Sequence, residues 1–367
     1  MTSEASQPPQ PESDPGSGVG LRRFFFPALF VAALFSTLWL RGAPISSSND
    51  VVSESNEWSL GGHALGTTWS VKGWGGIPNT VELRQALEKV LDGVDASMST
   101  WRKDSELSRM NRSGLTPVPV SKQLLSVLTA AEQVSKATNG AFDVTVGPLV
   151  AAWGFGAKRT EVPPDAAELA PLRARVGYTL LSIDATKSTV TRARDDVSID
   201  LSAIAKGYAV DRMGDVLRAA GLTHWMVEVG GEVLVAGLNA ESQSWKLGIE
   251  EPTAGGRSVA LAIALTDGAL ATSGDYRQFR LVDGKMVSHT IDPRTGAPVS
   301  HGPASVSVIA NDCMSADAWA TALMVLGPEG LPLATDMGLG VLILERQPDK
   351  SIKQHMNAAF RARLLAK

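Results

Sequence analysis

One apolar run, Phe24 to Leu40, separates a short N-terminal tail from everything in this chain that can fold in water. The run holds about 17 residues, close to the roughly 20 that a membrane-spanning helix needs. Arg22 and Arg23 precede it and only Arg41 follows, and such an excess of positive charge keeps the preceding side in the cytoplasm. We therefore expect a single-pass signal anchor over residues 22–41 in the inner membrane, with the body of the chain exported to the periplasmic side.

A cleaved export signal is the alternative to this anchor, because the sequence RRFF at residues 22–25 is faintly similar to a twin-arginine motif. Cleavage after Ala43 would need a small residue where Arg41 stands, which favours the uncleaved anchor. The body of the chain is exported under either interpretation.

Composition divides the remainder of the chain into three parts. Residues 1–21 are rich in Pro, Ser, Gln and Glu and have almost nothing to bury, so they should form a disordered cytoplasmic tail. Residues 42–58 are expected to be a linker, since Pro, Ser and Asn dominate them without periodicity. Residues 59–367 should form one folded domain.

Charge and cysteine content exclude some classes of protein. The formal net charge is -4, which argues against nucleic acid as a partner because binding a phosphate backbone requires a basic face. Cys313 is the only cysteine, so no internal disulfide can form, and no cysteine follows the apolar run to carry the lipid of a lipoprotein.

Helical and strand patterns alternate irregularly along the body. Amphipathic periodicity predicts helices over residues 80–96, 121–138 and 206–220. Alternating, β-rich segments predict strands over residues 63–71, 180–185, 189–194, 224–234 (a hairpin turning at Gly230-Gly231), 245–252, 259–265 and 269–273. No strand precedes a GxGxxG or Walker loop, so a nucleotide-binding parallel sheet is not indicated. The expected fold is α+β, with largely antiparallel sheets and packed helices.

The stretch Ile199 to Asp211, IDLSAIAKGYAVD, combines a carboxylate, small residues and a lysine at a predicted helix start. The first N–H groups of a helix lack intrahelical partners and face outward with the positive end of the dipole, so they can bind a phosphate. Asp200 and Lys206 are candidates for such a site. An N-cap role for Asp200 and a solvated side chain for Lys206 are the alternatives.

A second helix start carries a carboxylate and a hydroxyl on one face. Ser315 is a possible cap, and Asp317 and Thr321 lie four residues apart near the N-terminus. These hard oxygen ligands suit Mg²⁺, which takes one or two carboxylates together with substrate phosphates. An Asp in a first helical turn can also serve only the helix dipole.

Aromatic and imidazole side chains complete the candidates. Trp101 stands in the polar segment 97–111, which we expect to be irregular. Phe142 follows a predicted helix end and directly precedes Asp143. Either aromatic ring could contact a flat heterocycle or simply pack against the protein. His289, expected within a strand, could act as a base near neutral pH or be a structural histidine. The five histidines are scattered without helical metal-ligand spacing, so zinc is not expected.

Taken together, these segments resemble the ApbE family, the FAD:protein FMN transferases. The resemblance covers most of the chain from Leu60 to about Leu344. Its segments, in the order of the family, are ALGTTWSV, MSTW, GAFDVTVGPLV, IDLSAIAKGYAVD, VEVGGEV, ATSGDYRQF, SHTIDPRTGAPV and SADAWATALMVLG. No single segment is specific, but the ordered set is.

The resemblance implies an enzyme that splits FAD and moves its FMN phosphoryl group to a threonine of an exported acceptor protein, with release of AMP. By position, Mg²⁺ would be held by the backbone carbonyl of Ala203 and the side chains of Asp317 and Thr321, and His289 would be the base. FAD would contact Leu65, Trp101, Ala141, Phe142, Asp143, Asp200, Lys206 and Ile291. The family's usual acceptors are flavoprotein subunits of membrane redox complexes.

This chain departs from the family at two contact positions and in its mode of attachment. Leu65 stands where the family often has methionine and Trp101 where it often has tyrosine, so an apolar or aromatic surface is kept at both. Many members carry a lipoprotein cysteine, which the apolar run would replace here. A Mg²⁺-dependent FAD pyrophosphatase, a flavin-binding envelope protein without activity and a membrane-tethered interaction domain are the alternative functions.

Overall fold

The structure is a computed structural model that describes residues 51–52, 56–76, 79–155, 162–252, 258–275, 279–282, 285–299, 302–349 and 351–365. Within those ranges no helix is both long enough and apolar enough to cross a bilayer. The expected anchor over residues 22–41 and the tail before it lie outside the described residues.

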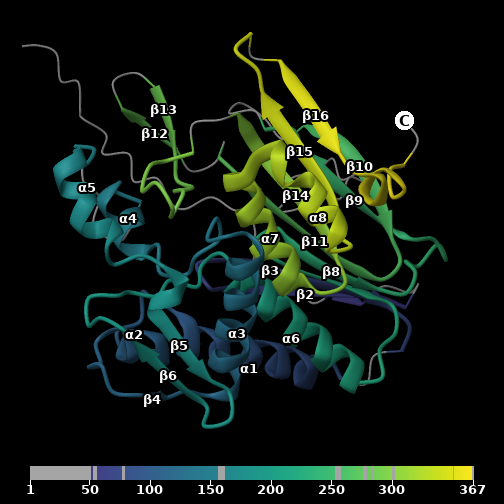
Figure 1. The fold of residues 1–367 in the computed structure, drawn as a ribbon. Coiled ribbons are helices and arrows are strands. Elements are labelled where there is room, and N and C mark those ends of the chain that lie inside the picture. The colour runs from purple at the N-terminus through teal and green to yellow at the C-terminus, as the bar shows by residue number, and fades with distance from the viewer. Residues whose placement is uncertain are drawn as a thin grey trace, which may run out of the picture.

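A nine-stranded sheet forms the centre of the molecule (Figure 1), with the strand order β1-β2-β3-β7-β8-β11-β14-β15-β16. Every strand pair among the described residues is antiparallel. The strands of this sheet are β1 (Val51–Val52), β2 (Glu57–Ala64), β3 (Thr67–Trp74), β7 (Trp225–Val229), β8 (Glu232–Ala236), β11 (Gly268–Gly274), β14 (Pro303–Ala310), β15 (Gly340–Arg346) and β16 (Ile352–Met356).

Smaller sheets surround the central one. They pair β4 (Val118–Pro119) with β6 (Thr189–Arg192) and β5 (Leu181–Asp184), β9 (Trp245–Glu250) with β10 (Val259–Leu265), and β12 (Phe279–Val282) with β13 (Lys285–Ser288). The expected α+β class with largely antiparallel sheets is therefore confirmed.

Helices α1, α6, α7 and α8 cover one face of the central sheet, and α6 packs between α1 and α7 (Figure 1). The helices are α1 (Thr80–Met98), α2 (Glu106–Asn111), α3 (Lys122–Ala137), α4 (Gly147–Ala152), α5 (Ala166–Arg173), α6 (Ala205–Ala219), α7 (Cys313–Leu326), α8 (Leu331–Asp336) and α9 (Ala358–Arg361), with short 3-10 turns at Tyr178–Leu180 and Gly327–Gly330.

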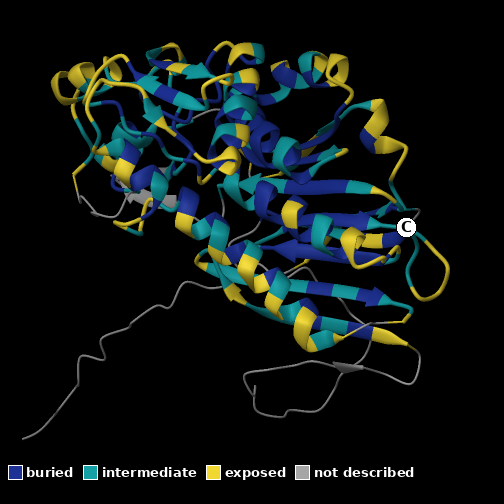
Figure 2. Ribbon diagram, turned by 90° about the horizontal axis from the view of Figure 1, so that it is seen from below, coloured by how far each residue is buried: buried dark blue, intermediate teal, exposed yellow. Residues whose placement is uncertain are grey.

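Both faces of the central sheet are covered, and successive side chains of a strand point to opposite faces, so one strand contributes to two cores. In β15, Val341 and Ile343 join the core that the helices cover, whereas Leu342 and Leu344 join a second core beneath β9, β10 and α9. Figure 2 shows the result as continuous burial along the central strands and exposure at the outer turns. A sheet covered on both sides is a rigid base for the turns at its edge.

Four local predictions from the sequence were wrong. The strand expected over residues 63–71 is two strands, because Leu65 and Gly66 adopt positive φ and turn the chain. The segment 97–111 contains helix α2, whose cap is Ser105. Helix α7 is capped by Asp312, so Ser315 lies inside its first turn. His289 follows the last residue of β13 and is not within it.

The separation of α6 and α7 depends on a glycine. A Cβ on Gly207 would lie 2.2 Å from the carbonyl oxygen of Cys313, a backbone atom that cannot turn aside. The missing side chain therefore allows the two helix starts to touch, which brings the residues of both into one site.

We predict that Gly207→Ala destabilises the protein by about 2 to 3 kcal/mol, because the added methyl group forces the two helix backbones apart. The matched control is Gly93→Ala in α1, where the nearest atom to a new Cβ is 4.0 Å away. That change should stabilise by up to about 1 kcal/mol through helix propensity. Denaturant unfolding measures both, and equal effects would contradict the close approach.

Candidate active site where helices α6 and α7 begin

Lys206 links the two helices that the sequence singled out. Its Nζ lies 3.4 Å from Oδ1 of Asp317 on α7 and 3.1 Å from Oε1 of Glu232 at the start of β8. Burial works against the charged ammonium, but the two carboxylates outweigh it and hold the pKa of Lys206 above its usual range. The predicted FAD residue and the predicted metal ligand are thus in direct contact.

Asp317 is buried, and α6 holds it in place. Its side chain is 4 % exposed, and its Oδ2 accepts the backbone N–H of Gly207 at 3.0 Å. Asp211, one turn further along α6, accepts the N–H groups of Cys313 and Met314 at 2.8 and 2.9 Å and so caps α7 from the neighbouring helix. Burial raises the pKa of Asp211 to about 6, against the effect of those two bonds.

The other two predicted metal ligands belong to the same two segments, but Thr321 lies past the middle of α7 and not near its N-terminus, where the sequence analysis expected it. Thr321 stands one turn beyond Asp317 on α7, and its hydroxyl lies 3.2 Å from that of Ser273 on β11. Ala203 belongs to the turn that leads into α6 and directly precedes its N-cap, Ile204. Gly207, whose N–H binds Asp317, follows three residues after this N-cap. A carboxylate, a hydroxyl and a backbone carbonyl are oxygen donors that fit Mg²⁺.

Charge also favours a cation here. Two buried carboxylates share the ammonium of Lys206, and Oε2 of Glu232 is buried without a hydrogen-bond partner among the described residues. Burial raises the pKa of Glu232 well above its usual range although Lys206 opposes the rise, so a bound cation would favour the ionised form of this buried group. Among the described residues no group of three His, Cys, Asp or Glu side chains forms a metal site, and the expected donor set is not of that kind.

Asp200 does not cap helix α6, which begins five residues later, at Ala205. Its Oδ1 accepts the N–H of Ser202 at 2.8 Å, and its own N–H donates to the carbonyl of Val144 at 2.7 Å. That second bond places the segment after Phe142 beside the turn that leads to α6.

The β2–β3 turn lies beside Lys206 as well. Gly230, in the β7–β8 turn, donates its N–H to the carbonyl of Thr68 at 3.0 Å, and a Cβ on it would lie 3.4 Å from Cδ of Lys206. Leu65, at the tip of the β2–β3 turn, is half-buried against the helix-covered core. Two hairpin turns therefore bound the lysine.

Asp143 holds the wall of a cavity. Its carboxylate accepts the N–H and hydroxyl of Thr145 at 2.8 and 2.6 Å and the N–H of Tyr178 at 2.6 Å. Burial raises the pKa of Asp143, and these bonds oppose the rise. Ala141 and Phe142 beside it are 1 % and 2 % exposed, so both residues, backbone included, are packed in the interior.

The cavity beside Asp143 measures about 460 Å³ and is lined by Gly140, Asp143, Ala170, Arg173, Ala174, Val176, Gly177, Tyr178, Thr179, Pro293 and Arg294. Lys206 and Asp317 are not among these residues, so the cavity is a neighbour of the ion cluster and not its container. Its volume is within the range of small-molecule sites. The buried Ile291, bridged to Pro298, precedes the loop that supplies Pro293.

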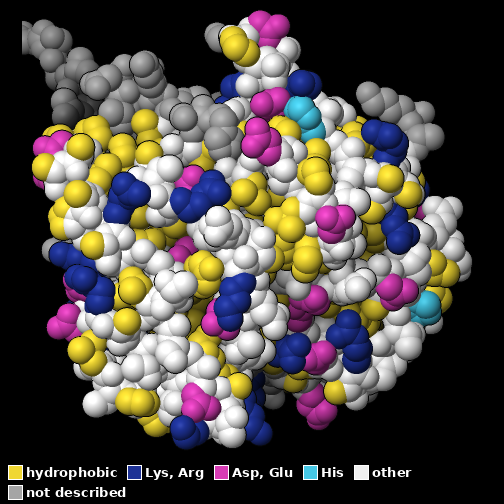
Figure 3. Space-filling model, in the orientation of Figure 1, with side chains coloured by type: hydrophobic (Ala, Val, Ile, Leu, Met, Phe, Trp, Pro, Cys, Tyr) yellow, Lys and Arg dark blue, Asp and Glu magenta, His cyan; other side chains and the backbone are white. Residues whose placement is uncertain are grey.

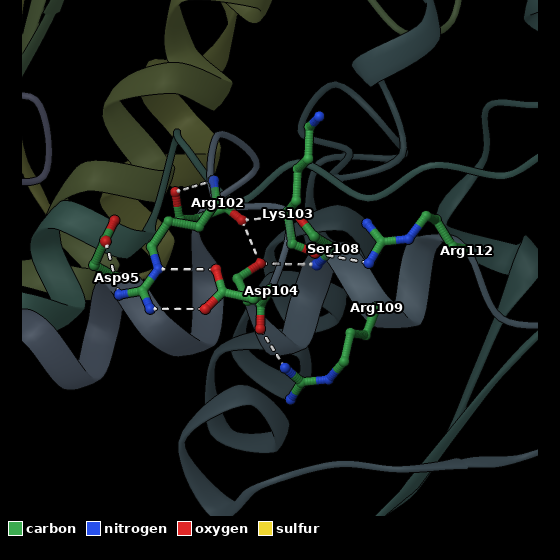
Figure 4. A network of polar contacts seen from close by, with 9 residues as sticks. Asp95, Arg102, Lys103, Asp104, Ser108, Arg109 and Arg112 are labelled. Atoms are coloured by element: carbon green, nitrogen blue, oxygen red, sulfur yellow. Dashed lines mark hydrogen bonds and ion pairs between the residues drawn. The ribbon is translucent and has the colours of Figure 1, made fainter.

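Trp101 lies in the loop between α1 and α2, and Figure 4 shows the polar contacts of Arg102 in this loop. The carbonyl of Ser99 accepts the hydroxyls of Ser105 and Ser108 at 2.5 and 3.2 Å, and Arg102 bridges Asp95 and Asp104. The indole is nevertheless 76 % exposed. A large ring that is held in place but open to solvent is available to a ligand.

His289 is positioned from another direction, by the segment after α4. Its ring meets that of Phe155 edge to face, with centroids 6.3 Å apart. Trp153 fixes the same loop by donating its indole N–H to the carbonyl of Gly296 at 2.8 Å. In Figure 1, α4, α5 and the β12–β13 hairpin accordingly lie together at one end of the molecule.

Sequence reasoning missed two buried glutamates in the β7–β8 hairpin. Glu228 and Glu232 are 5 % and 4 % exposed, and they flank the glycine turn. Glu228 accepts the N–H of Gly231 at 2.7 Å and thereby holds the turn beside Lys206. A charged residue at each end of a paired-glycine turn, inside an otherwise apolar hairpin, was the available signal.

A family model described as the ApbE family matches residues 65–343, which includes every candidate site residue. The chain belongs to the ApbE family. An FAD:protein FMN transferase of Vibrio cholerae is 41 % identical over 307 residues, covering 82 % of this chain and 91 % of that protein. The FAD:protein FMN transferase of Escherichia coli K12 is 35 % identical over 317 residues, covering 84 % and 89 %.

Solved structures of ApbE proteins share the fold. The flavin transferase ApbE of Vibrio cholerae has a TM-score of 0.77 at 39 % identity, covering 84 % of this chain and 99 % of that one. The apo flavinyl transferase ApbE of Pseudomonas stutzeri also has a TM-score of 0.77, at 33 % identity, covering 89 % and 100 %. The family and fold expected from the ordered sequence segments are confirmed.

We predict that Glu228 makes stability depend on pH. Burial raises its pKa from 4.5 to about 7, so the folded state holds the proton more tightly than the unfolded state. The resulting stabilisation is complete below pH 4.5 and is lost as pH rises through 7, by up to about 3 kcal/mol. Glu228→Gln cannot titrate, and in urea unfolding it should gain relative to wild type between pH 5 and pH 8.

The exposed Glu241 supplies the control, because Glu241→Gln should leave the pH profile of stability as in wild type. If Glu228→Gln and wild type lose stability in parallel over that interval, Glu228 is not the titrating group.

Proposed function

We propose that this chain is a Mg²⁺-dependent FAD:protein FMN transferase that attaches FMN through a phosphoester to a threonine of an acceptor protein and releases AMP. Membership of the ApbE family and the names of relatives that align over most of their length support the transferase activity. The observation that carries the metal-dependent chemistry is the buried cluster of Lys206, Glu232 and Asp317, in which Oε2 of Glu232 has no hydrogen-bond partner among the described residues.

The residues of this chain divide the work between binding and proton transfer. FAD is proposed to contact Leu65, Trp101, Ala141, Phe142, Asp143, Asp200, Lys206 and Ile291. The exposed indole of Trp101 offers a face for a flat ring, and the cavity beside Asp143 offers room for part of the dinucleotide. The ammonium of Lys206 keeps a third N–H that neither carboxylate occupies, and this donor can face a phosphate oxygen.

The proposed reaction makes one P–O bond and breaks another. The threonine oxygen of the acceptor attacks the FMN phosphorus, the diphosphate P–O bond breaks, and AMP leaves with the bonding electron pair. A ring nitrogen of His289 takes the hydroxyl proton. Ala203, Asp317 and Thr321 would hold Mg²⁺, which supplies neutralisation of diphosphate charge when bound. Phosphoryl transfer asks the protein mainly for such positioning and charge compensation.

The cellular setting is also a proposal. The apolar run before the folded domain would anchor the protein in the inner membrane with this site on the periplasmic side, facing an exported flavoprotein subunit of a membrane redox complex. On the face that Figure 3 shows, acidic and basic side chains are interspersed and no basic field dominates, as suits a protein partner better than nucleic acid.

The test is to incubate the purified full-length protein with FAD, Mg²⁺ and a candidate acceptor, and then to weigh the acceptor. A transferase leaves FMN on a threonine and AMP in solution. Release of AMP and FMN without a change in the acceptor's mass would indicate a pyrophosphatase instead, and binding of FAD without AMP would indicate a flavin carrier. Omission of Mg²⁺ should abolish the transfer.

We predict that His289→Ala lowers kcat by roughly 10² to 10⁴, the contribution of a placed base, and leaves the Kd for FAD within about threefold. Stopped-flow turnover and FAD titration measure the two separately. His355→Ala is the matched control, because His355 lies on the edge strand β16 and pairs with Glu345 of β15. This change should affect neither kcat nor the Kd for FAD. Loss of FAD binding by a folded His289→Ala protein would remove the base assignment.

We predict that Asp317→Ala abolishes Mg²⁺-dependent turnover, since the buried carboxylate is the charged member of the proposed ligand set. The control is Asp215→Ala, which removes an exposed carboxylate of α6. Among the described residues, this carboxylate forms ion pairs with Arg212 and Arg218. Activity is measured against Mg²⁺ concentration. An unchanged Mg²⁺ requirement in Asp317→Ala would place the metal elsewhere.

A further inference from the structure

Glu232 is the second carboxyl group that Lys206 contacts, and its Oε1 lies slightly closer to the ammonium than Oδ1 of Asp317 does. The Nζ to Oε1 separation is 3.1 Å for Glu232, against 3.4 Å to Oδ1 of Asp317. Both carboxylates are almost fully buried, with side chains 5 % and 4 % exposed. Lys206 therefore contacts two almost fully buried carboxyl groups at once.

The two carboxylates differ in spare acceptor capacity. On Asp317, Oδ2 is occupied by the N–H of Gly207 and Oδ1 faces Lys206. On Glu232, Oε2 is buried and accepts no hydrogen bond from the described residues. A buried acceptor without a donor is unfavourable, so the structure leaves open a place for one more N–H.

The stem of Lys206 is confined to the space between these partners. The Gly230 turn closes over it, since a Cβ at Gly230 would lie 3.4 Å from Cδ of the lysine and 3.0 Å from Cγ2 of Thr67. Gly207, the next residue, is locked against Cys313 of α7. The side chain is still 30 % exposed, so it keeps room to turn from one carboxyl group toward the other.

A conflict arises if Asp317 binds a divalent cation, because Lys206 and the cation then compete for one carboxylate. The competition is strong in a buried site, where charges interact through a low effective dielectric constant. An ammonium without an alternative partner would stay on Asp317 and repel the cation. Glu232 supplies the alternative.

We propose that Glu232 is a positioning residue that draws the ammonium of Lys206 away from Asp317 and thereby frees this carboxylate for the cation. The N–H that leaves Asp317 is accepted by the open Oε2 of Glu232. This inference rests on the proposed metal-dependent function and concerns the same site. It gives a role to a buried acidic side chain that the metal and FAD assignments do not use.

The experiment measures Mn²⁺ binding to purified full-length protein saturated with FAD, by the loss of the free-ion signal in electron paramagnetic resonance. Glu232→Gln keeps the shape and one acceptor of the side chain but removes its charge, so Lys206 should settle on Asp317. The Kd for Mn²⁺ should then rise about tenfold. The control is Glu345→Gln, which removes a carboxylate of β15 that pairs with His355 and has no part in the cluster, and which should leave the Kd within about twofold.

A second background separates competition from the loss of nearby negative charge. Lys206→Met removes the competitor, so adding Glu232→Gln to it should raise the Kd for Mn²⁺ by no more than about threefold. Equal losses with and without the lysine would overturn the inference, as would an unchanged Kd in Glu232→Gln or an equal loss in Glu345→Gln. A simple structural defect would act in both backgrounds.

Circular dichroism verifies the fold of each variant. If Glu232→Gln does not fold, Lys206→Met alone carries the test: it should bind Mn²⁺ more tightly than wild type, and weaker binding contradicts the competition. Wild-type protein that binds no Mn²⁺ would contradict the proposed metal dependence and this inference together. Wild type that binds Mn²⁺ and transfers FMN, with Glu232→Gln unaffected, would contradict only the inference.

Discussion

The burial of two carboxylates around one ammonium is the constraint on which the site depends. Lys206, Glu232 and Asp317 come from α6, β8 and α7, and their charges hold these three elements together in a space with little water. Ion pairs of this kind add little net stability, because desolvation offsets most of the attraction. Their value here is instead chemical, since the buried carboxyl groups offer more acceptor oxygens than one ammonium can satisfy.

The fold is arranged to make that burial possible. The central sheet is covered on both faces, so its strands form a firm base, and the helices stand close enough for α6 to cap α7 through Asp211. Gly207 lets the helix starts meet without a side chain between them. Glu228 fixes the glycine turn beside the lysine stem. Asp211, Gly207 and Glu228 therefore set the geometry of the cluster, although none of them is proposed to contact FAD or Mg²⁺.

Much of this arrangement could be predicted from the sequence. Periodicity located the longer helices and about half of the strands, because amphipathic faces must meet a core, and the α+β class followed from their order; β14, β15 and β16 were not predicted. The pairing of the Lys206 and Asp317 segments came from the resemblance to the ApbE family and not from spacing. The cap of α7 was misplaced, since Asp312 and Ser315 are both good caps and only tertiary packing decides between them.

The remaining features depend on contacts between distant segments, which a single sequence does not reveal. Leu65 takes a positive φ that favours glycine, so the β2–β3 turn had no turn signal at its first position. In the sequence Glu232 was one residue of a predicted strand, and its role became clear only because Lys206 lies 3.1 Å away in the structure. The domain boundaries, the site residues and the membrane anchor stay predictions, and the anchor lies outside the described residues.

The most direct measurement is a crystal structure of the protein with FAD and Mn²⁺, in which anomalous scattering locates the ion. This account predicts the ion about 2 Å from a carboxylate oxygen of Asp317, next to the diphosphate, with the ammonium of Lys206 on Glu232. An ion bound away from Asp317, or Lys206 still on Asp317 with the ion in place, would contradict it.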